Sequence, residues 1–294
     1  MDQSCFLCPR ECGTDRQLRS GFCGAQSLPT VAKVMLHQWE EPCICYGGGS
    51  GAVFFSGCQM RCVFCQNHAI SQRTCGDPMD TYALADLFLK LEEQGACNLN
   101  LVSPTPHLET LIPALEEAKK RGFSLPVVFN SGGYEKVSVL CRLEGLVDVY
   151  LPDFKFFDPV LSHTYGGAAD YRERATEAIG EMLRQTGSPR LEGEKLLQGT
   201  IVRHLILPGH TDDSIHILDH LCGMLSPKDI ILSLLRQYTP MHRAKEFPKL
   251  RRKLTTLEYH RVAKVADALG FSRIYTQEKE SATEDYVPDF QKNN

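Results

Sequence analysis

Several features that would place a protein in a broad class at once are missing from this sequence of 294 residues. Its apolar runs, such as Ile230-Ile231-Leu232, are no longer than a strand, so we expect no membrane-spanning segment. Residues 1–5 show no basic stretch leading into an apolar one, so we expect no signal peptide and a cytoplasmic location. The formal net charge is −4, without the basic excess typical of nucleic-acid-binding proteins, so we expect no nucleic-acid partner.

Cysteine, by contrast, is abundant, with 13 residues. An odd number in tight clusters, in a chain without an export signal, argues against a disulfide framework and indicates metal or cluster ligands. The clusters end at Cys65, whereas Cys75, Cys97, Cys141 and Cys222 are scattered along the chain. We expect these four to be small buried apolar residues.

Strand-like apolar segments alternate with helical segments from residue 52 onwards. The expected strands cover residues 52–56, 99–102, 126–130, 147–151, 200–207 and 229–235, with a short last strand over 273–277. The expected helices cover residues 81–94, 107–121, a stretch from 135, 171–185, 214–225 and a last helix that begins at the capping box Thr255-x-x-Glu258. This alternation predicts a parallel sheet, because each crossover helix returns the chain to the same end.

Such a series of strand–helix units suits either an incomplete barrel or a doubly wound sheet. No G-x-G-x-x-G pattern follows the first expected strand, which disfavours a dinucleotide-binding sheet. We therefore predict an α/β fold in which residues 51–294 form a partial (β/α)6 TIM-like barrel, and residues 1–50 form a small cysteine-rich cap. In both architectures the functional site lies at the carboxyl ends of the strands.

Three cysteines follow the first expected strand with the spacing C-x3-C-x2-C. Cys58, Cys62 and Cys65 can hold three corners of a cubane iron–sulfur cluster, which ordinarily takes four thiolates. One iron then stays open and can bind a substrate or cofactor directly. A zinc site with His68 as the fourth ligand, or a reactive thiol pair, is the alternative, but the spacing differs from the paired C-x2-C of zinc ribbons.

At this triplet the sequence resembles the radical S-adenosylmethionine (radical SAM) superfamily, and in particular its branch of pyruvate formate-lyase activating enzymes. The branch resemblance also rests on Cys5-x2-Cys8-Pro9-Arg10-x-Cys12 and on residues 98–107, 129–135, 148–158, 203–209 and 237–240. The resemblance implies a barrel of the radical SAM type, with a [4Fe-4S] cluster on the triplet and S-adenosylmethionine (SAM) as cofactor.

The resemblance further implies an oxidoreductase that reductively cleaves SAM to a 5′-deoxyadenosyl radical, which abstracts a hydrogen atom from the substrate. Reduced flavodoxin or ferredoxin is the implied electron donor. The substrate stays open between a glycyl radical enzyme that the protein activates, a peptide and a small metabolite. A non-catalytic zinc or electron-transfer protein is the hypothesis from another class. No side chain is assigned as a catalytic residue.

Polar residues at the strand ends are the candidate SAM contacts. Asp153 and Lys155 follow the fourth expected strand and resemble an Asp-x-Lys that contacts the methionyl part of SAM in the activating enzymes; a surface ion pair is the alternative. Many radical SAM proteins carry Gly-Gly-Glu after the second strand, where this chain has the hydroxyls of Ser103 and Thr105 instead. The remaining candidates are Asn130, Ser131 and the pair Gly132-Gly133 after the third strand, and Phe64 as a packing partner for adenine.

A second set of cysteines precedes the barrel. Cys5, Cys8, Cys12 and Cys23 supply four thiolates, which close a metal shell and suit either a structural zinc or a second iron–sulfur cluster. Three further residues keep open roles, namely Cys43, Cys45 and His242, the last as a cofactor or substrate contact or as a surface residue.

Overall fold

The strands predicted from residue 52 onwards belong to one sheet in the computed structural model, which describes residues 4–277, Pro288 and Phe290. The 10-stranded sheet has the order β10-β9-β8-β6-β5-β4-β2-β1-β3, with β7 paired to β8. Parallel pairing is continuous from β2 to β10. The parallel strands are β2 (Ser50–Phe55), β4 (Leu99–Val102), β5 (Val127–Ser131), β6 (Val149–Pro152), β8 (Lys195–Leu205), β9 (Ile231–Leu235) and β10 (Ile274–Thr276).

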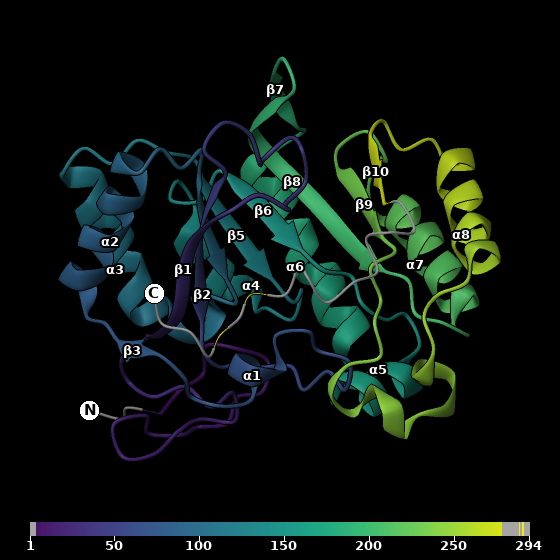
Figure 1. Cartoon of the computed structure of the whole chain (residues 1–294), viewed down its shortest axis with the longest axis horizontal. Coiled ribbons are helices and arrows are strands. Elements are labelled where there is room, and N and C mark those ends of the chain that lie inside the picture. The colour runs from purple at the N-terminus through teal and green to yellow at the C-terminus, as the bar shows by residue number, and fades with distance from the viewer. Residues whose placement is uncertain (1–3, 278–287, 289, 291–294) are drawn as a thin grey trace.

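The sheet curves into a partial barrel with helices on its outside (Figure 1). Within the described residues no strand pairing joins β3 to β10, so the barrel stays open. The prediction of a partial TIM-like α/β barrel is therefore confirmed. The longer helices are α2 (Thr81–Glu93), α3 (Leu108–Lys120), α5 (Pro159–Gly166), α6 (Tyr171–Thr186), α7 (Thr211–Met224) and α8 (Thr256–Ala268). Among the described helices, none combines the length and the apolar composition needed to cross a bilayer.

Burial of β4 shows which side chains face the helices and which face the barrel interior. Leu99 and Leu101 belong to the same buried apolar cluster as the inner faces of α2 and α3. Because successive side chains of a strand point to opposite faces, Asn100 and Val102 point into the barrel. The helical residues of this cluster include Leu84, Phe88, Leu91, Leu111 and Leu115.

Several elements differ from the prediction. Helix α7 begins at Thr211, three residues before the expected start. The expected helix from residue 135 is only a short α4 (Val137–Leu140) followed by the 3-10 turn η2 (Cys141–Leu143). Elements that the sequence did not predict are α1 (His68–Ser71), α5, β3 (Asp77–Pro78), β7 (Arg190–Glu192), and the 3-10 turns η1 (Thr105–His107), η3 (His242–Glu246) and η4 (Pro248–Arg251).

Residues 1–50 contain one strand that the sequence did not predict, β1 (Thr30–His37). It pairs antiparallel with β2, in a register from Val31 opposite Phe55 to His37 opposite Ser50. The range assigned to the cap therefore includes a strand of the barrel sheet. The division of the chain into a cap and a barrel stays a prediction.

The connection from β1 to β2, residues 38–49, enters the barrel, and we call it the plug segment. Cys43 and Ile44 are fully buried in it. The Leu196 amide donates to the Cys43 carbonyl at 2.8 Å, and Asn98 Nδ2 donates to the Ile44 carbonyl at 2.5 Å. The plug segment packs on inward-facing residues of β5, β6, β8 and β9, namely Val128, Val149, Leu151, Ile201 and Ile231.

Candidate active site

A cavity of about 390 Å³ opens at the carboxyl ends of the parallel strands, above the plug segment. This volume lies in the range typical of small-molecule sites. Figure 1 shows the arrowheads of β5, β6 and β8 directed to the side of the molecule where α1 and the N-terminal segment lie. Most of the candidate residues line this one cavity, namely Cys58, Cys62, Phe64, Cys65, Ser103, Asn130, Ser131, Gly132, Asp153 and Lys155.

The loop that carries the cysteine triplet is fastened by backbone hydrogen bonds on two sides. The amide of Cys58 donates to the Cys23 carbonyl at 3.0 Å. On the other side, the amide of Val63 donates to the Tyr165 carbonyl at 2.8 Å, at the end of α5. The loop begins at Gly57, whose φ of +92° favours glycine. The backbone of the triplet is therefore positioned by the N-terminal segment and by α5 together.

The thiols of the triplet are buried close to one another. Burial, followed by the neighbouring Cys62, raises the pKa of Cys58 far above its ordinary value, and burial raises the pKa of Cys62 to about 12. Burial likewise raises the pKa of Cys65. Such thiols stay protonated unless a cation lies against them, and cluster iron is such a cation. The donor set therefore fits an iron–sulfur cluster with three cysteine ligands.

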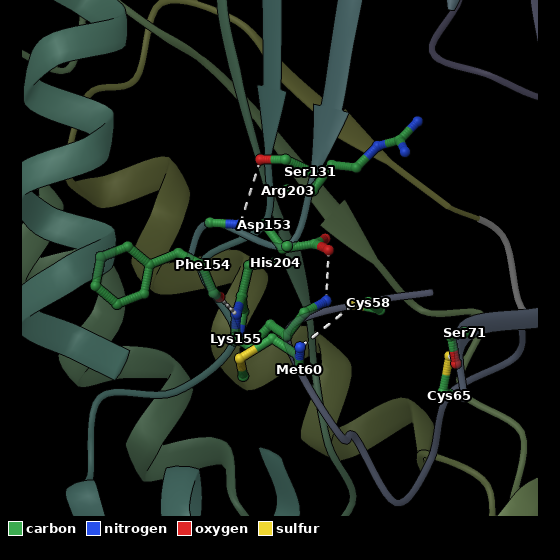
Figure 2. Close-up of polar contacts among 12 residues, drawn as sticks. Cys58, Met60, Cys65, Ser71, Ser131, Asp153, Phe154, Lys155, Arg203 and His204 are labelled. Carbon is green, nitrogen blue, oxygen red and sulfur yellow. Dashed lines mark hydrogen bonds and ion pairs between the residues drawn. The ribbon is translucent and has the colours of Figure 1, made fainter. Parts of the chain in front are cut away.

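Hydrogen bonds already reach the outer thiols of the triplet (Figure 2). The Met60 amide donates to Cys58 Sγ at 3.4 Å, and Ser71 Oγ lies 3.3 Å from Cys65 Sγ. Contacts of this kind tune the potential of iron–sulfur clusters. In the described part of the chain, no three His, Cys, Asp or Glu side chains converge as a ready-made metal shell, so cluster binding requires the thiol rotamers to turn toward one another.

His68, the fourth ligand of the alternative zinc site, is directed elsewhere. Its Nδ1 lies 3.2 Å from the Cys65 carbonyl oxygen, and its ring stacks on His242 with a centroid distance of 4.9 Å. His242 has a left-handed φ of +50° and does not line the cavity. These contacts disfavour the zinc site of the triplet.

Asp153 and Lys155 form an ion pair at the end of β6, beside the triplet. Figure 2 shows Lys155 reaching between Asp153 and Cys58. Burial by itself would lower the pKa of Lys155, but the carboxylate of Asp153 raises it above its ordinary value, so Lys155 is a cation. The pair thus offers a cation and an anion beside the thiols, which suits the carboxylate and ammonium groups of SAM.

Tyr171 of α6 holds the loops after β5 and β6 together, although no pattern in the sequence singled it out. Its hydroxyl lies 2.9 and 2.8 Å from the carbonyl oxygens of Gly132 and Asp153, which share its one proton, and it accepts from the Lys155 amide at 2.9 Å. Gly133 has a φ of +77°, and a Cβ there would lie 2.1 Å from the Asp153 carbonyl oxygen. Glycine at position 133 therefore lets the loop after β6 approach closely.

Ser103 and Thr105 have different surroundings. Ser103 lines the cavity with a left-handed φ of +58°. Thr105 is fully buried outside the cavity lining, and its hydroxyl donates to Glu135 Oε1 at 3.1 Å. The expected role of Thr105 as a SAM contact is not supported by this position, because η1 turns its side chain toward Glu135.

Glu135 is a buried carboxyl group behind the triplet. Gln59 Nε2 donates to its Oε1 at 2.9 Å, whereas its buried Oε2 has no hydrogen-bond partner among the described residues. Burial raises the pKa of Glu135 to about 7. Glu135 therefore connects the residue after Cys58 with the Thr105 turn.

Phe64 lines the cavity and also fills the loop, because its ring packs near Phe156 and Tyr238 at centroid distances of 6.0 and 6.2 Å.

The strand period predicts that only one of Arg203 and His204 faces the barrel interior. Arg203 lines the cavity, whereas the two ring nitrogens of His204 lie 2.7 Å from the Phe154 carbonyl and 2.8 Å from Ser214 Oγ.

The four N-terminal cysteines lie near one another and next to the triplet loop. Burial raises the pKa of Cys8 to about 11, with added contributions from the thiols of Cys23, Cys5 and Cys12. Arg16 Nη2 lies 3.6 Å from Cys23 Sγ. Cys43 and Cys45 belong to the plug segment, apart from this set.

Comparison with known proteins identifies the family. The model described as the Radical SAM superfamily matches residues 52–222, which is more than half of the chain. This protein belongs to the radical SAM superfamily, as the cysteine triplet predicted. It is therefore a radical SAM enzyme, and membership implies a [4Fe-4S] cluster and SAM as cofactors.

Two further proteins are similar to this chain. The uncharacterized protein MJ0674 of Methanocaldococcus jannaschii is 29% identical over 282 residues, which cover 93% of this chain and 77% of the relative. The crystal structure of Streptococcus suis SuiB bound to precursor peptide SuiA matches with a TM-score of 0.50 and 12% identity. That match covers 75% of this chain but only 46% of SuiB, and it shows a shared fold.

Proposed function

We propose that this enzyme holds a [4Fe-4S] cluster on Cys58, Cys62 and Cys65, cleaves SAM reductively, and abstracts a hydrogen atom from a substrate in the cavity. When bound and reduced, the cluster and SAM together supply a 5′-deoxyadenosyl radical. The observation that carries the proposal is that the three thiols and the ion pair of Asp153 and Lys155 line one cavity at the strand ends.

The side chains of the cavity have distinct tasks in this proposal. Lys155 pairs with the carboxylate of SAM, and Asp153 accepts from its ammonium group. Ser103, Asn130 and Ser131 offer polar groups for the ribose or the carboxylate. Apolar side chains exclude water and stray hydrogen donors from the radical, among them Phe54, Met60, Phe64, Leu205 and Leu235.

The proposal is tested by anaerobic reconstitution with iron and sulfide, followed by reduction in the presence of SAM. The wild type should bind four irons per triplet site and release 5′-deoxyadenosine. Cys58→Ser should lose both properties of that site, whereas the matched control Cys141→Ser should keep them, because Cys141 is exposed and not buried as the sequence predicted. Cleavage of SAM by Cys58→Ser would refute the proposal. A protein with zinc alone would favour the non-catalytic alternative.

As substrate we propose a glycyl radical enzyme, with reduced flavodoxin or ferredoxin as electron donor. The support is the resemblance of the triplet and the strand ends to activating enzymes. Incubation with a candidate partner should give the electron paramagnetic resonance signal of a glycyl radical. SAM cleavage without such a signal would favour the second candidate, modification of a peptide or small metabolite, and mass spectrometry of the products would then identify the substrate.

We also propose that Cys5, Cys8, Cys12 and Cys23 bind a zinc ion or a second iron–sulfur cluster. The support is their mutual proximity and the bond between the backbones of Cys23 and Cys58. Metal analysis of Cys58→Ser reconstituted with iron distinguishes the two, because only a second cluster leaves bound iron in that variant. Full loss of both zinc and iron from Cys58→Ser would contradict the second site.

A further inference from the structure

The cavity has a charged floor opposite the cysteine triplet, made by the plug segment and the barrel strands. Arg203 Nε donates to Glu41 Oε1 at 2.7 Å and Nη2 to Glu41 Oε2 at 2.5 Å. Nη2 also pairs with Glu40. In Figure 2 the guanidinium of Arg203 points away from Lys155 and Cys58. The ion pairs of the floor are thus separate from the pair proposed to bind SAM.

The floor carries more negative than positive charge. Arg203 is the described cation that pairs with both Glu40 and Glu41, so two carboxylates share one guanidinium. The side chains of Glu40 and Glu41 are only 7% and 4% exposed. A buried carboxylate is costly unless it is paired, so the floor favours a further cation.

A second observation concerns Asn100, which lies behind Glu40 and does not itself line the cavity. Asn100 is fully buried, and its Nδ2 donates to Glu40 Oε1 at 2.7 Å. This bond fixes the orientation of the amide, because only the NH2 group can donate to a carboxylate. The other end, Asn100 Oδ1, has no partner among the described residues. A buried acceptor without a donor is rare in folded proteins, and this one marks the Glu40 end of the floor as a region short of hydrogen-bond donors.

The charge of the floor and its shortage of hydrogen-bond donors favour the same chemistry. An anion would meet two carboxylates, whereas an ammonium or guanidinium group carries the required charge and several N–H donors. Trp39 lines the same cavity, and indole rings attract organic cations.

We propose that the floor formed by Glu40, Glu41 and Arg203, with Asn100 behind Glu40, binds an organic cation of the substrate, an ammonium or guanidinium group. This inference rests on the proposed function, because it treats the cavity shared with the triplet as the substrate site. The group can belong to a lysine or arginine side chain of a polypeptide or to a small amine, and the two sources are separated by the experiment below.

The experiment measures equilibrium binding to the reconstituted, unreduced protein with SAM present. The polypeptide probes are acetyl-Gly-Lys-Gly-amide, acetyl-Gly-Gln-Gly-amide and acetyl-Gly-Glu-Gly-amide, and the small probes are agmatine and its neutral counterpart pentanamide. We expect the cationic probe of at least one series to bind about tenfold more tightly than its neutral counterpart. The series that shows the preference identifies the source of the cation.

The variant Glu40→Gln should remove this preference, since it neutralises the excess charge and keeps the size of the side chain. The control Glu116→Gln changes an exposed carboxylate of α3 and should keep the preference. Three results on the wild-type protein overturn the inference: equal binding of all probes, no binding of any probe, or tighter binding of the glutamate peptide. These results do not depend on whether Glu40→Gln folds. Binding is measured before reduction, so failure of SAM cleavage is recorded separately.

Discussion

Replacing Glu135 with glutamine should stabilise the protein relative to the wild type by more at pH 8 than at pH 5. The pKa of Glu135 is raised by burial from 4.5 to about 7 in the folded protein. Between these values the folded chain holds a proton that the unfolded chain has lost, so the stability due to this group falls as the pH rises. Relative to acidic solution, in which both states are protonated, the shift lowers the free energy of unfolding by about 3 kcal/mol above pH 7. At pH 5 it lowers the free energy of unfolding by less than about 1 kcal/mol.

The glutamine variant removes the titration and keeps an oxygen for the bonds from Thr105 and Gln59. The difference in the free energy of unfolding between variant and wild type should therefore change by about 2–3 kcal/mol in favour of the variant from pH 5 to pH 8. Urea unfolding of the cluster-free, reduced protein, followed by circular dichroism, measures this change. The exposed control Glu116→Gln should show almost none. A variant whose difference from the wild type is the same at both pH values would refute the reasoning.

Three further predictions follow from other contacts. Gly57→Ala introduces a Cβ 2.8 Å from the Cys23 carbonyl oxygen at a φ of +92°. It should lower the free energy of unfolding by about 1–3 kcal/mol and reduce the amount of bound iron, as measured by denaturant unfolding and iron analysis. Lys155→Met should weaken SAM binding by about tenfold or more with iron content retained, and unchanged affinity in equilibrium dialysis would contradict the pairing of Lys155 with SAM. Thr255→Ala removes the capping box of α8 and should cost about 1 kcal/mol, seen by calorimetry as a lower Tm with SAM cleavage unaffected.

The parallel strands of the barrel were predictable because buried strands leave a strong signal in the sequence. Each expected strand from residue 52 onwards is present, since short apolar runs that are bounded by turn residues and alternate with helical segments are typical of buried parallel strands. Because the functional site of such a fold lies at the carboxyl ends of the strands, most of the candidate residues chosen there line one cavity. Thr105 was misplaced because its position after a strand predicts the end of the sheet at which it lies but not the direction of its side chain. The 3-10 turn η1 directs this side chain into the protein.

The floor of the cavity could not be predicted from the sequence. The adjacent carboxylates Glu40 and Glu41 look like solvent-exposed residues of a loop, and the plug segment has no periodicity that indicates burial. Their partner Arg203 lies more than 160 residues later in the chain, on β8. A contact over this distance depends on the tertiary fold, and no local propensity of residues 38–49 contains it.

The N-terminal segment therefore contributes to the site from two opposite sides. The carbonyl of Cys23 fastens the triplet loop at the carboxyl ends of the strands, while the plug segment fills the barrel beneath the cavity and supplies Glu40 and Glu41. A barrel of strand–helix units alone would leave the triplet loop without one of its backbone anchors and the cavity without its charged floor. Since β1 connects the two contributions and is paired along β2, the strand that leads into the triplet, movement of either part is opposed by the same ladder of hydrogen bonds. The distance between the triplet loop and the charged floor is thus set by residues 1–50, in which the sequence predicted no barrel strand.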